Sequence, residues 1–391
     1  MSIESAVVLA AGEGIRLRPL TKYRPKPMLP VTNKPILQHV FDTLVEVGFT
    51  EIHVVVGYRS NRVQEYFGFD YEGVPLTYHL QEQQLGTGHA VLQSQEDVGG
   101  SFLVVNGDQL VSPDIVEAVV EGHSDGTQLA TIGVVESEMA PQYGAVSLDG
   151  DTVTELVEKP GEGNYRLLNA GVYAFEDDMF DVISATPSVD GEQSLSAALV
   201  NAIADGEVVR GVKRKGLWRD ATYPWDLLAL TGEMLDRSNE QIRIAPSATI
   251  DDDAIIRGPV VVGSDAVVAP GAVVGPYSTI GRNSFIGCNA VVDNTIVDED
   301  TRIGPNSTLV DCVTGVNTDI GAGVTIEGGN ADVRIGNQIH EDTQLGAVVA
   351  DRAKLSGGVS VSPGTIVGSG ATVATGVSLD GVVDEGAEVV R

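Results

Sequence analysis

The C-terminal part of this chain repeats a single apolar residue at every sixth position. The first run consists of Val262, Val268, Val274, Ile280, Ile286 and Val292, and the second of Val349, Leu355, Val361, Val367 and Val373. Each short, flat strand of a parallel β-helix turns one apolar residue inward, so a six-residue period is typical of this fold. We therefore predict a β-helix from about Gln241 onward. The period is lost between Asp293 and Gln344, and we expect an irregular stretch from Ala331 to Gln344.

The N-terminal part alternates strand-like and helix-like segments instead. Apolar strands are expected at 6–11, 52–56, 76–80, 102–105 and 172–175, and amphipathic helices at 36–45, 61–67, 195–203 and 225–235. Such alternation predicts an α/β domain with a mostly parallel sheet and helices covering both faces. A chain of 391 residues can bury two cores, so we place one domain at 1–237 and a second at 238–391.

The charge balance is strongly acidic. The chain has 24 Lys+Arg against 55 Asp+Glu, a formal net charge of −31. This charge argues against nucleic acid and anionic membranes as partners of the bulk surface, because like charges repel. An excess of carboxylates with little lysine resembles proteins of extreme halophiles, and an ordinary acidic cytosolic protein is the alternative.

The N-terminus and the cysteines bear on the cellular compartment. Glu4 and a short apolar run fit neither a signal peptide nor a membrane span. Two cysteines, Cys288 and Cys312, give no disulfide framework and fit a reducing interior. We expect a cytoplasmic protein without a membrane partner.

A basic, proline-rich loop follows the first expected strand. Residues 9–31 read LAAGEGIRLRPLTKYRPKPMLPV, and no acid lies between Arg16 and Lys26. Cations gathered after a strand and a Gly-rich turn indicate a site for a multiply charged anion such as a chain of phosphates. A dinucleotide-binding turn is a weaker interpretation, because Leu17 stands at the third glycine position of Gly-x-Gly-x-x-Gly. A solvated basic loop is the other alternative.

The loop resembles the N-terminal signature of the sugar-1-phosphate nucleotidylyltransferases, which reads Gly-x-Gly-x-Arg, then Pro-Leu-Thr, then Pro-Lys-Pro. The matching residues are Gly12, Gly14, Arg16, Pro19, Leu20, Thr21, Pro25, Lys26 and Pro27. Together with the repeat, the chain is similar to archaeal-type UDP-N-acetylglucosamine and UDP-glucose pyrophosphorylases and to glucose-1-phosphate thymidylyltransferases. The resemblance implies a Rossmann-like nucleotidyltransferase domain, then a left-handed parallel β-helix of hexapeptide repeats that forms a homotrimer.

A second motif, QEQQLGTGHA at 81–90, follows the third expected strand. Its glycines allow the backbone to approach a planar ligand closely, and an amide side chain can match the edge of a base. The motif resembles the uracil-reading loop of the family, which implies that Gln81 meets the pyrimidine edge. The nucleotide-binding residues implied by the resemblance are Leu9, Ala10, Ala11, Gly12, Gly14, Gln81, Gly86, Thr87, Asn106 and Gly107.

Asp108 ends a buried strand segment, where open α/β sheets bind ligands. A simple Asx turn would explain it equally well from the residues alone. The resemblance implies that Asp108 and Asp220 hold a catalytic Mg²⁺, whose preference for oxygen ligands both would satisfy. It also implies that Gly144, Glu158 and Asn169 bind the sugar and that Lys159 meets the sugar phosphate.

The resemblance implies a uridylyltransferase that joins UTP and a hexose-1-phosphate, with Arg16, Lys26 and Asp108 as catalytic residues. Glucose-1-phosphate and N-acetylglucosamine-1-phosphate both remain open as substrates. A thymidylyltransferase that uses dTTP and a noncatalytic sugar-nucleotide sensor are the alternatives.

Some relatives use the β-helix to transfer acetyl groups, with a histidine as the base. Residues 311–324 resemble the family's segment just after that histidine, which puts Pro305 at the histidine position and Thr308 where a tyrosine is usual. His340 is the one histidine beyond His123. We expect a structural or regulatory β-helix, with acetyl transfer as the alternative.

Overall fold

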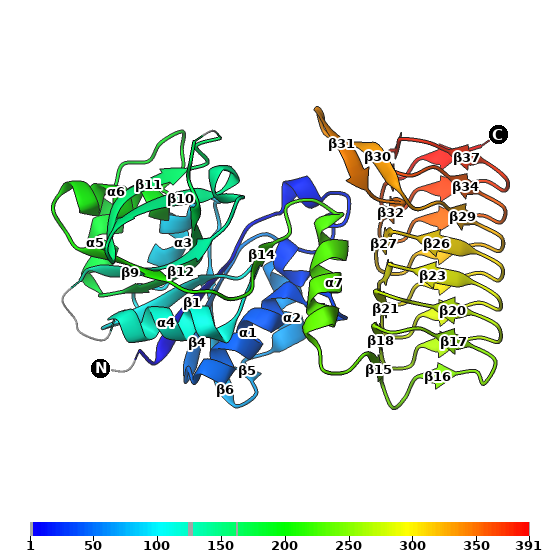
Figure 1. The fold of residues 1–391 in the computed structure, drawn as a ribbon, viewed down its shortest axis with the longest axis horizontal. Coiled ribbons are helices and arrows are strands. Elements are labelled where there is room, and N and C mark those ends of the chain that lie inside the picture. The colour runs from blue at the N-terminus through cyan, green and yellow to red at the C-terminus, as the bar shows by residue number, and fades with distance from the viewer. Residues whose placement is uncertain (1–2, 124–127, 162, 391) are drawn as a thin grey trace. The chain divides into compact units, whose positions relative to one another are not determined.

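The computed structural model describes residues 3–123, 128–161 and 163–390 (Figure 1). The chain forms two compact units, and the basic loop is divided between them. The first unit comprises Met1–Glu13, Arg24–Met28 and Ile36–Asp220, and the second comprises Gly14–Tyr23, Leu29–Pro35 and Ala221–Arg391. Arg16 therefore belongs to the unit of the repeat, and Lys26 to the unit of the sheet.

The described part of the first unit contains one ten-stranded sheet, which is parallel at its centre and has antiparallel strands on either side. In spatial order its strands are β10 (Gly144–Asp149), β11 (Thr152–Glu158), β13 (Val209–Lys213), β9 (Ala130–Glu136), β12 (Leu167–Phe175), β7 (Phe102–Asn106), β1 (Ser5–Ala10), β4 (Glu51–Val56), β6 (Val74–Leu80) and β5 (Asp70–Tyr71). Strands β7, β1, β4 and β6 run parallel, while β12 is antiparallel to β7 and β9. The expected strands are confirmed, and so is the expected parallel pairing of the central strands.

The sheet has a core on each face because its central strands are apolar along most of their length. In β1, Val8 faces one core together with Leu37 and Phe41, and Val7 faces the other together with Phe102 and Phe175. Continuous burial on both faces is typical of a parallel sheet that helices cover. Helices α1 (Ile36–Val47), α2 (Ser60–Phe67) and α4 (Pro113–His123) contribute to the first core, and α3 (Thr87–Leu92), α5 (Asp178–Ala185) and α6 (Leu195–Ala204) to the second.

Short elements complete both units. In the first unit they are η2 (Lys26–Met28), β8 (Gln109–Val111), η3 (Ala140–Gln142) and β14 (Trp218–Asp220), and in the second η1 (Ile15–Leu17), β2 (Pro30–Val31) and β3 (Lys34–Pro35). The helix expected at 225–235 is α7 (Asp226–Arg237), but it groups with the second unit, where it contacts β2 and β27. The expectation that it covers the sheet is corrected accordingly.

The repeat forms a parallel β-helix whose described residues make three sheets. The first sheet contains β15 (Ile242–Ile244), β18 (Val260–Val262), β21 (Ser278–Ile280), β24 (Ile296–Val297), β27 (Cys312–Thr314), β32 (Ala347–Val349), β35 (Thr365–Val367) and β38 (Val382–Val383). The second contains β16 (Thr249–Ile250), β19 (Val267–Val268), β22 (Phe285–Ile286), β25 (Arg302–Ile303), β28 (Asp319–Ile320), β33 (Lys354–Leu355), β36 (Thr372–Val373) and β39 (Glu388–Val389). The third contains β17 (Ile255–Ile256), β20 (Val273–Val274), β23 (Val291–Asp293), β26 (Thr308–Val310), β29 (Thr325–Ile326), β34 (Ser360–Val361) and β37 (Ser378–Leu379).

The residues on the six-residue period are buried inside the coils, as predicted. The coils continue from Asp293 to Ile326, where the period is lost, and the stretch expected to be irregular, 331–344, leaves the coils as a hairpin. Val262 pairs with Ile280, eighteen positions on, whereas Ile280 pairs with Val297, seventeen positions on. A coil that is one residue shorter keeps its strands in register but shifts the sequence period, so the repeat looks broken when it continues.

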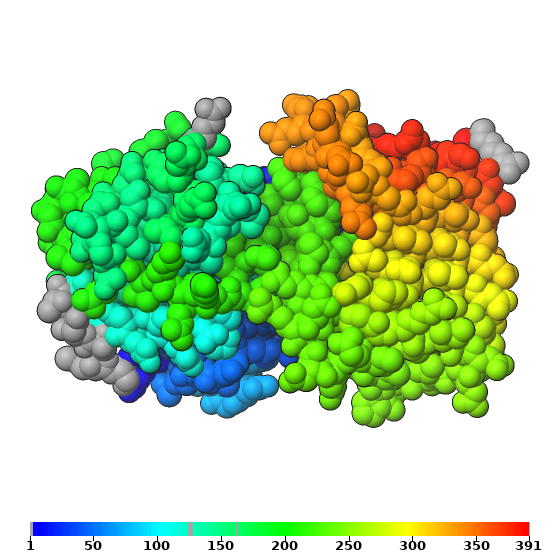
Figure 2. All heavy atoms as spheres, in the orientation of Figure 1, coloured from blue at the N-terminus to red at the C-terminus, as the bar shows by residue number. Residues whose placement is uncertain are grey.

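A hairpin interrupts the coils after β29. Strands β30 (Asn330–Ile335) and β31 (Gln338–Gln344) pair antiparallel around a two-residue turn at Gly336 and Asn337. Asp311 anchors its base, because its carboxylate accepts bonds from Gly329 N at 3.0 Å and from Gln344 Nε2 at 3.3 Å. The hairpin (orange) stands out from the surface of the coils (Figure 2).

Candidate active site

The edge of the first unit's sheet gathers most of the predicted nucleotide-binding residues. Strands β7, β1, β4 and β6 are parallel neighbours, so their carboxyl ends lie at one edge. The predicted residues there are 9–11, Gln81 and 106–108. Gly107 N donates to Leu9 O at 2.9 Å, which ties two of these strand ends together. Open α/β sheets bind ligands at such an edge, where the direction of strand order reverses.

The packing at this edge requires a glycine at position 107. A Cβ at this position would lie 2.9 Å from Val8 Cγ1 and 3.1 Å from Leu9 O. A side chain there would push the following Asp108 away from the strand end, so the Gly-Asp pair has a local structural cause.

Lys26 lies between the two aspartates that sequence spacing could not pair. Its side chain is buried, and Nζ donates to Asp108 Oδ2 at 2.8 Å and also to Asp220 Oδ1. Burial alone would lower the pKa of Lys26, but the two carboxylates outweigh burial and hold that pKa above its ordinary value. Strand β14 pairs with β8 so that Asp220 lies opposite Gln109, next to Asp108 in the chain. This pairing brings together two acids that lie far apart in the sequence.

Asp108 and Asp220 also fit a divalent cation of the magnesium type. Their oxygens converge on one positive group, and carboxylate oxygens are the ligands that Mg²⁺ prefers. Across residues 3–123, 128–161 and 163–390 there is no cluster of three or more His, Cys, Asp or Glu that could hold a metal. Two carboxylates suffice for Mg²⁺, because it commonly takes its other ligands from water and substrate phosphates.

The loop after β6 is built around Gln81. This buried side chain donates from Nε2 to Gly86 O and lies with the same atom 3.0 Å from His89 Nδ1. Both contacts stay inside the loop, so they shape it and direct the amide carbonyl elsewhere. Gly86 has a φ of +99°, and a Cβ there would lie 2.5 Å from Gln193 O.

Gln193 is a residue of this site that sequence reasoning missed. Its backbone N donates to Leu85 O at 2.6 Å, and its backbone O accepts from Gly88 N at 2.8 Å. Its side chain donates from Nε2 to Ile183 O at 2.5 Å. The motif at 81–90 is thus held from a segment a hundred positions away, and no local pattern marks that segment.

The predicted sugar-binding residues form a second cluster in the same unit. Strands β10 and β11 pair Gly144 with Glu158, and a Cβ on Gly144 would lie 3.5 Å from Glu158 Oε2 and 3.7 Å from Asn169 Nδ2. Asn169 Nδ2 donates to Tyr173 Oη at 2.9 Å, which fixes the amide. Lys159 Nζ lies 3.7 Å from Glu158 Oε1. The structure therefore brings all four residues together.

The signature residues from Gly14 to Thr21 lie in the second unit. Gly14 adopts a left-handed conformation with φ +67°, and its carbonyl accepts from Thr21 Oγ1 at 2.9 Å. Arg16 follows in η1 with an exposed side chain, whose Cζ lies 5.9 Å from the ring centroid of Tyr223. Tyr223 was not among the residues expected from sequence.

The two units differ in charge at these positions. In the first, acids and one buried lysine share a compact polar cluster at the sheet edge. In the second, an exposed arginine rests over an aromatic face. Fixed cations and paired carboxylates provide the charge neutralisation and positioning that phosphoryl chemistry needs.

Comparisons with known proteins agree with this chemistry. The family described as "Nucleotidyl transferase" matches residues 5–236, and the "GMPPB C-terminal domain" matches residues 256–383. A bifunctional protein GlmU of Methanococcus maripaludis strain C7 is 36% identical over 410 residues, which cover 99% of this chain and 97% of that protein. The UTP–glucose-1-phosphate uridylyltransferase AglF of Haloferax volcanii is 36% identical over 224 residues, 56% of this chain and 92% of that protein.

A solved UDP-glucose pyrophosphorylase in complex with UDP-glucose shares the fold. Its TM-score is 0.55 at 23% identity, covering 60% of this chain and all of that one. Within the described residues, no helix has the length and apolar character to cross a membrane. The family match over more than half of the chain, together with a relative that spans nearly all of it, shows that this chain belongs to the nucleotidyl transferase family.

Proposed function

We propose that this chain transfers a uridylyl group from UTP to a hexose-1-phosphate, releasing pyrophosphate. The observation that carries this proposal is the buried Lys26 between Asp108 and Asp220, next to the strand ends that bind ligands in open α/β sheets. A phosphate oxygen of the sugar-1-phosphate attacks the α-phosphorus of UTP. The bond from that phosphorus to the oxygen bridging the β-phosphate breaks, and pyrophosphate leaves with that oxygen.

The attacking phosphate is already an anion, so the protein needs no general base. Its contribution is positioning and the neutralisation of charge on the transferred phosphate and on the leaving pyrophosphate. We assign this role to Arg16 and Lys26, assisted by the backbone N–H groups of residues 12–14. Because its pKa is raised, Lys26 stays protonated through the neutral range.

Asp108 and Asp220 would hold Mg²⁺. When bound, the ion neutralises phosphate charge and orients the two anionic substrates. Lys26, already hydrogen-bonded to both carboxylates, keeps them in place before substrate arrives.

Base and sugar recognition follow from the two polar clusters. Gln81 uses Nε2 within its own loop, so we assign its Oε1 as an acceptor for N3–H of uracil, with Gly86 and Thr87 alongside. Residues 9–11, Gly12, Gly14, Asn106 and Gly107 complete the nucleotide site. Gly144, Glu158 and Asn169 would bind the sugar, and Lys159 its phosphate. Thymine also carries N3–H, so dTTP is the competing nucleotide.

A substrate panel tests the proposal. The four ribonucleoside triphosphates and dTTP are each combined with glucose-1-phosphate, N-acetylglucosamine-1-phosphate and mannose-1-phosphate, and pyrophosphate release is measured with Mg²⁺. UTP with one of the first two sugars should give the highest kcat/KM. A preference for dTTP would reassign the nucleotide. If no pair of substrates released pyrophosphate, the proposed catalysis would be overturned in favour of a noncatalytic sugar-nucleotide sensor.

We further propose that the family domain ends near residue 237, that residues 238–391 form a domain of their own, and that the β-helix assembles the chain as a homotrimer. Light scattering should then give a mass of about three times 41.0 kDa. A mass near 41.0 kDa at micromolar concentration would contradict the trimer.

A further inference from the structure

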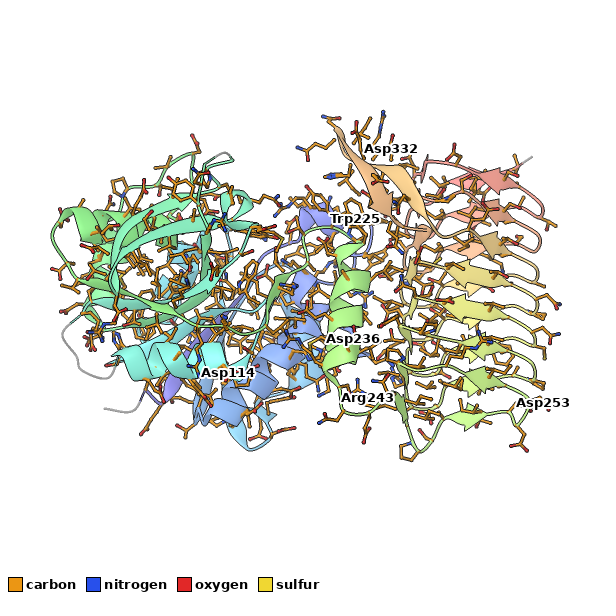
Figure 3. All side chains as sticks on the ribbon, in the orientation of Figure 1. Asp114, Trp225, Asp236, Arg243, Asp253 and Asp332 are labelled. Atoms are coloured by element: carbon orange, nitrogen blue, oxygen red, sulfur yellow. The ribbon has the colours of Figure 1, made fainter. Side chains whose placement is uncertain are left out.

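The hairpin β30–β31 carries an aromatic contact that the proposed chemistry does not use. The His340 ring lies 4.2 Å from the ring of Tyr223 and 5.1 Å from the ring of Trp225, between centroids. Tyr223 and Trp225 stack on each other at 4.8 Å with an angle of 12° between their planes. In Figure 3, Trp225 is labelled at the end of α7 that is nearer the hairpin, and Asp332 is labelled on β30 of the hairpin. All these residues belong to the second unit.

His340 contributes its ring rather than its Nε2 to this contact. Its Nε2 is buried and has no hydrogen-bond partner within the described residues. A catalytic or ligand-binding imidazole would direct a nitrogen toward a polar group. The geometry at His340 is instead that of a planar group packed against two aromatic faces.

Tyr223 is fixed from a second direction by the start of α7. The carboxylate of Asp226 accepts from Tyr223 N at 2.7 Å and from Thr222 N at 2.8 Å through Oδ2. The backbone at Tyr223 is therefore held by α7, and the ring is held by His340. Above this fixed ring lies the guanidinium of Arg16, at 5.9 Å from the centroid, within the range of a cation–π interaction.

Coils of the β-helix also hold residues 19–23 of the loop that carries Arg16. Lys22 Nζ lies 3.0 Å from Glu385 Oε2, and Ser369 Oγ donates to Pro19 O at 3.4 Å. The guanidinium of Arg352 lies 5.0 Å from the ring centroid of Tyr23. Residues 14–23 of the loop are thus attached to the rest of the second unit at several points.

We propose that the hairpin β30–β31 positions the catalytic arginine: His340 packs Tyr223 into place, and Tyr223 holds the guanidinium of Arg16. His340 and Tyr223 are positioning residues and Arg16 is the catalytic residue. The proposal rests on the proposed function, because that function gives Arg16 its role in uridylyl transfer.

The expected size of the effect is modest. A cation over an exposed aromatic face is worth about two- to fivefold in an equilibrium. Small displacements of a charge-stabilising group cost additional rate. Removal of the His340 ring should therefore lower kcat about tenfold, with little change in KM for UTP, because Arg16 acts mainly on charge that develops in the transition state.

The test compares three variants of the full chain. His340→Ala removes the ring, His340→Phe keeps a ring without nitrogens, and Ile339→Ala is the matched control. Ile339 is the neighbouring residue of β31, is 57% exposed, and projects from the opposite face of the hairpin. We expect loss of kcat in His340→Ala, near-normal kcat in His340→Phe and near-normal kcat in Ile339→Ala, at similar melting temperatures.

A double-mutant cycle separates positioning from a general loss of structure. In an Arg16→Ala background, His340→Ala should cost nothing further, because the group it positions is gone. Product measured by mass spectrometry at micromolar enzyme can follow the slow variants. From a median kcat of about 10 s⁻¹, a 10⁴-fold loss still leaves a few turnovers per hour. Equal costs of His340→Ala in both backgrounds would overturn the proposal.

Hydrogen exchange supplies a readout that needs no turnover. His340→Ala should speed amide exchange in peptides covering 14–23 and 221–226, whereas Ile339→Ala should not. If the wild type transfers no uridylyl group but exchange responds as expected, the proposed function fails while the contact stands. If turnover is normal in the wild type and neither exchange nor kcat changes in His340→Ala, the positioning role fails while the proposed function stands.

Discussion

In the β-helix, each coil reproduces the environment of the coil before it, whereas each residue at the edge of the ten-stranded sheet has surroundings of its own. Ile303 packs among aliphatic residues much as Ile286 and Ile320 do one coil away. Lys26 meets carboxylates from β14 and from the turn after β7. Stability in the first region is a sum of similar local terms, while chemistry in the second depends on single side chains. Substitutions in the two regions should therefore have different consequences.

The largest expected effect is on turnover at the sheet edge. Asp220→Asn should lower kcat by about 10²- to 10³-fold, because the proposed Mg²⁺ site loses one of its two carboxylate ligands. Asp108→Asn should behave alike. The melting temperature should change little, since Lys26 keeps its other carboxylate partner.

Asp114→Asn is the matched control for this loss. Asp114 is an exposed acid in the first turn of α4 (Figure 3). Its variant should keep normal turnover. Near-normal kcat in Asp220→Asn with Mg²⁺ would show that the two aspartates do not hold the metal.

The contrast between regions also explains what the sequence could predict. The six-residue period marked the inward residues of the coils, because repetition makes a weak local signal visible. Between Val292 and Ile326 the period is lost because one residue fewer per coil shifts it without changing the register of the strands. The hairpin had a readable signal in Gly336-Asn337, a two-residue turn pair flanked by possible strands.

At the sheet edge, sequence alone had less to offer. The resemblance selected residues 9–12, Gly14, Lys26, Gln81 and Asp108. The structure places them at or near strand ends of the first unit, apart from Gly14. Contacts such as Gln193 with Gly86, or Tyr223 with Arg16, join segments that no period or short motif connects. Only the folded topology determines which distant residues meet.

The next effect is on stability in the β-helix. Ile303→Ala removes a fully buried inward side chain and should lower the free energy of unfolding by about 2–4 kcal/mol. It should leave kcat unchanged at temperatures below the transition. Urea unfolding followed by circular dichroism measures the change.

Ile255→Ala serves as its control, because Ile255 is 47% exposed on β17. Its cost should be below about 1 kcal/mol. Equal costs at both positions would contradict the assignment of Ile303 to the coil interior.

A fall in pH should change the stability of the two regions differently, by less than the substitutions above. His53 and His79 are buried in β4 and β6, with Nδ1 of one 3.0 Å from Nε2 of the other. Burial lowers the pKa of both imidazoles, despite nearby Glu51 and Asp97. Below about pH 6.5 the unfolded chain therefore binds more protons than the folded chain. The contribution of the two neutral histidines to the free energy of unfolding is complete above that pH and is lost as the pH falls toward their pKa values in the folded chain. The slope is at most about 1.4 kcal/mol per pH unit for each histidine.

In the coils, by contrast, the buried Cys312 thiol has its pKa raised by burial to about 12 and stays protonated across this range. Urea unfolding of the wild type and of a His53→Gln, His79→Gln variant at pH 7.5, 6.5 and 5.5 tests the point. The variant should show a flatter dependence on pH. An unchanged slope would show that the pair does not titrate in this range.

Salt should act on both regions through the net charge of −31. Molar KCl screens repulsion among the excess carboxylates, so the melting temperature should rise by a few degrees relative to low salt. Sorbitol at matched osmolality controls for the effect of water activity. A melting temperature that falls with KCl would contradict the halophile interpretation of the composition.

The smallest expected effect is zero: the β-helix should not transfer acetyl groups. The amine of glucosamine-1-phosphate must lose a proton before it attacks a thioester, and a general base contributes about 10²- to 10⁴-fold to such a step. Pro305, at the aligned position of the catalytic histidine, has no titratable group, and its carbonyl accepts from Gly323 N at 2.9 Å. His340 packs its ring against Tyr223 and Trp225, with Nε2 buried. Free thiol should therefore not appear when acetyl-CoA and glucosamine-1-phosphate are added. Thiol release that disappears in His340→Ala would show that His340 acts as a base and would place a second active site in the β-helix.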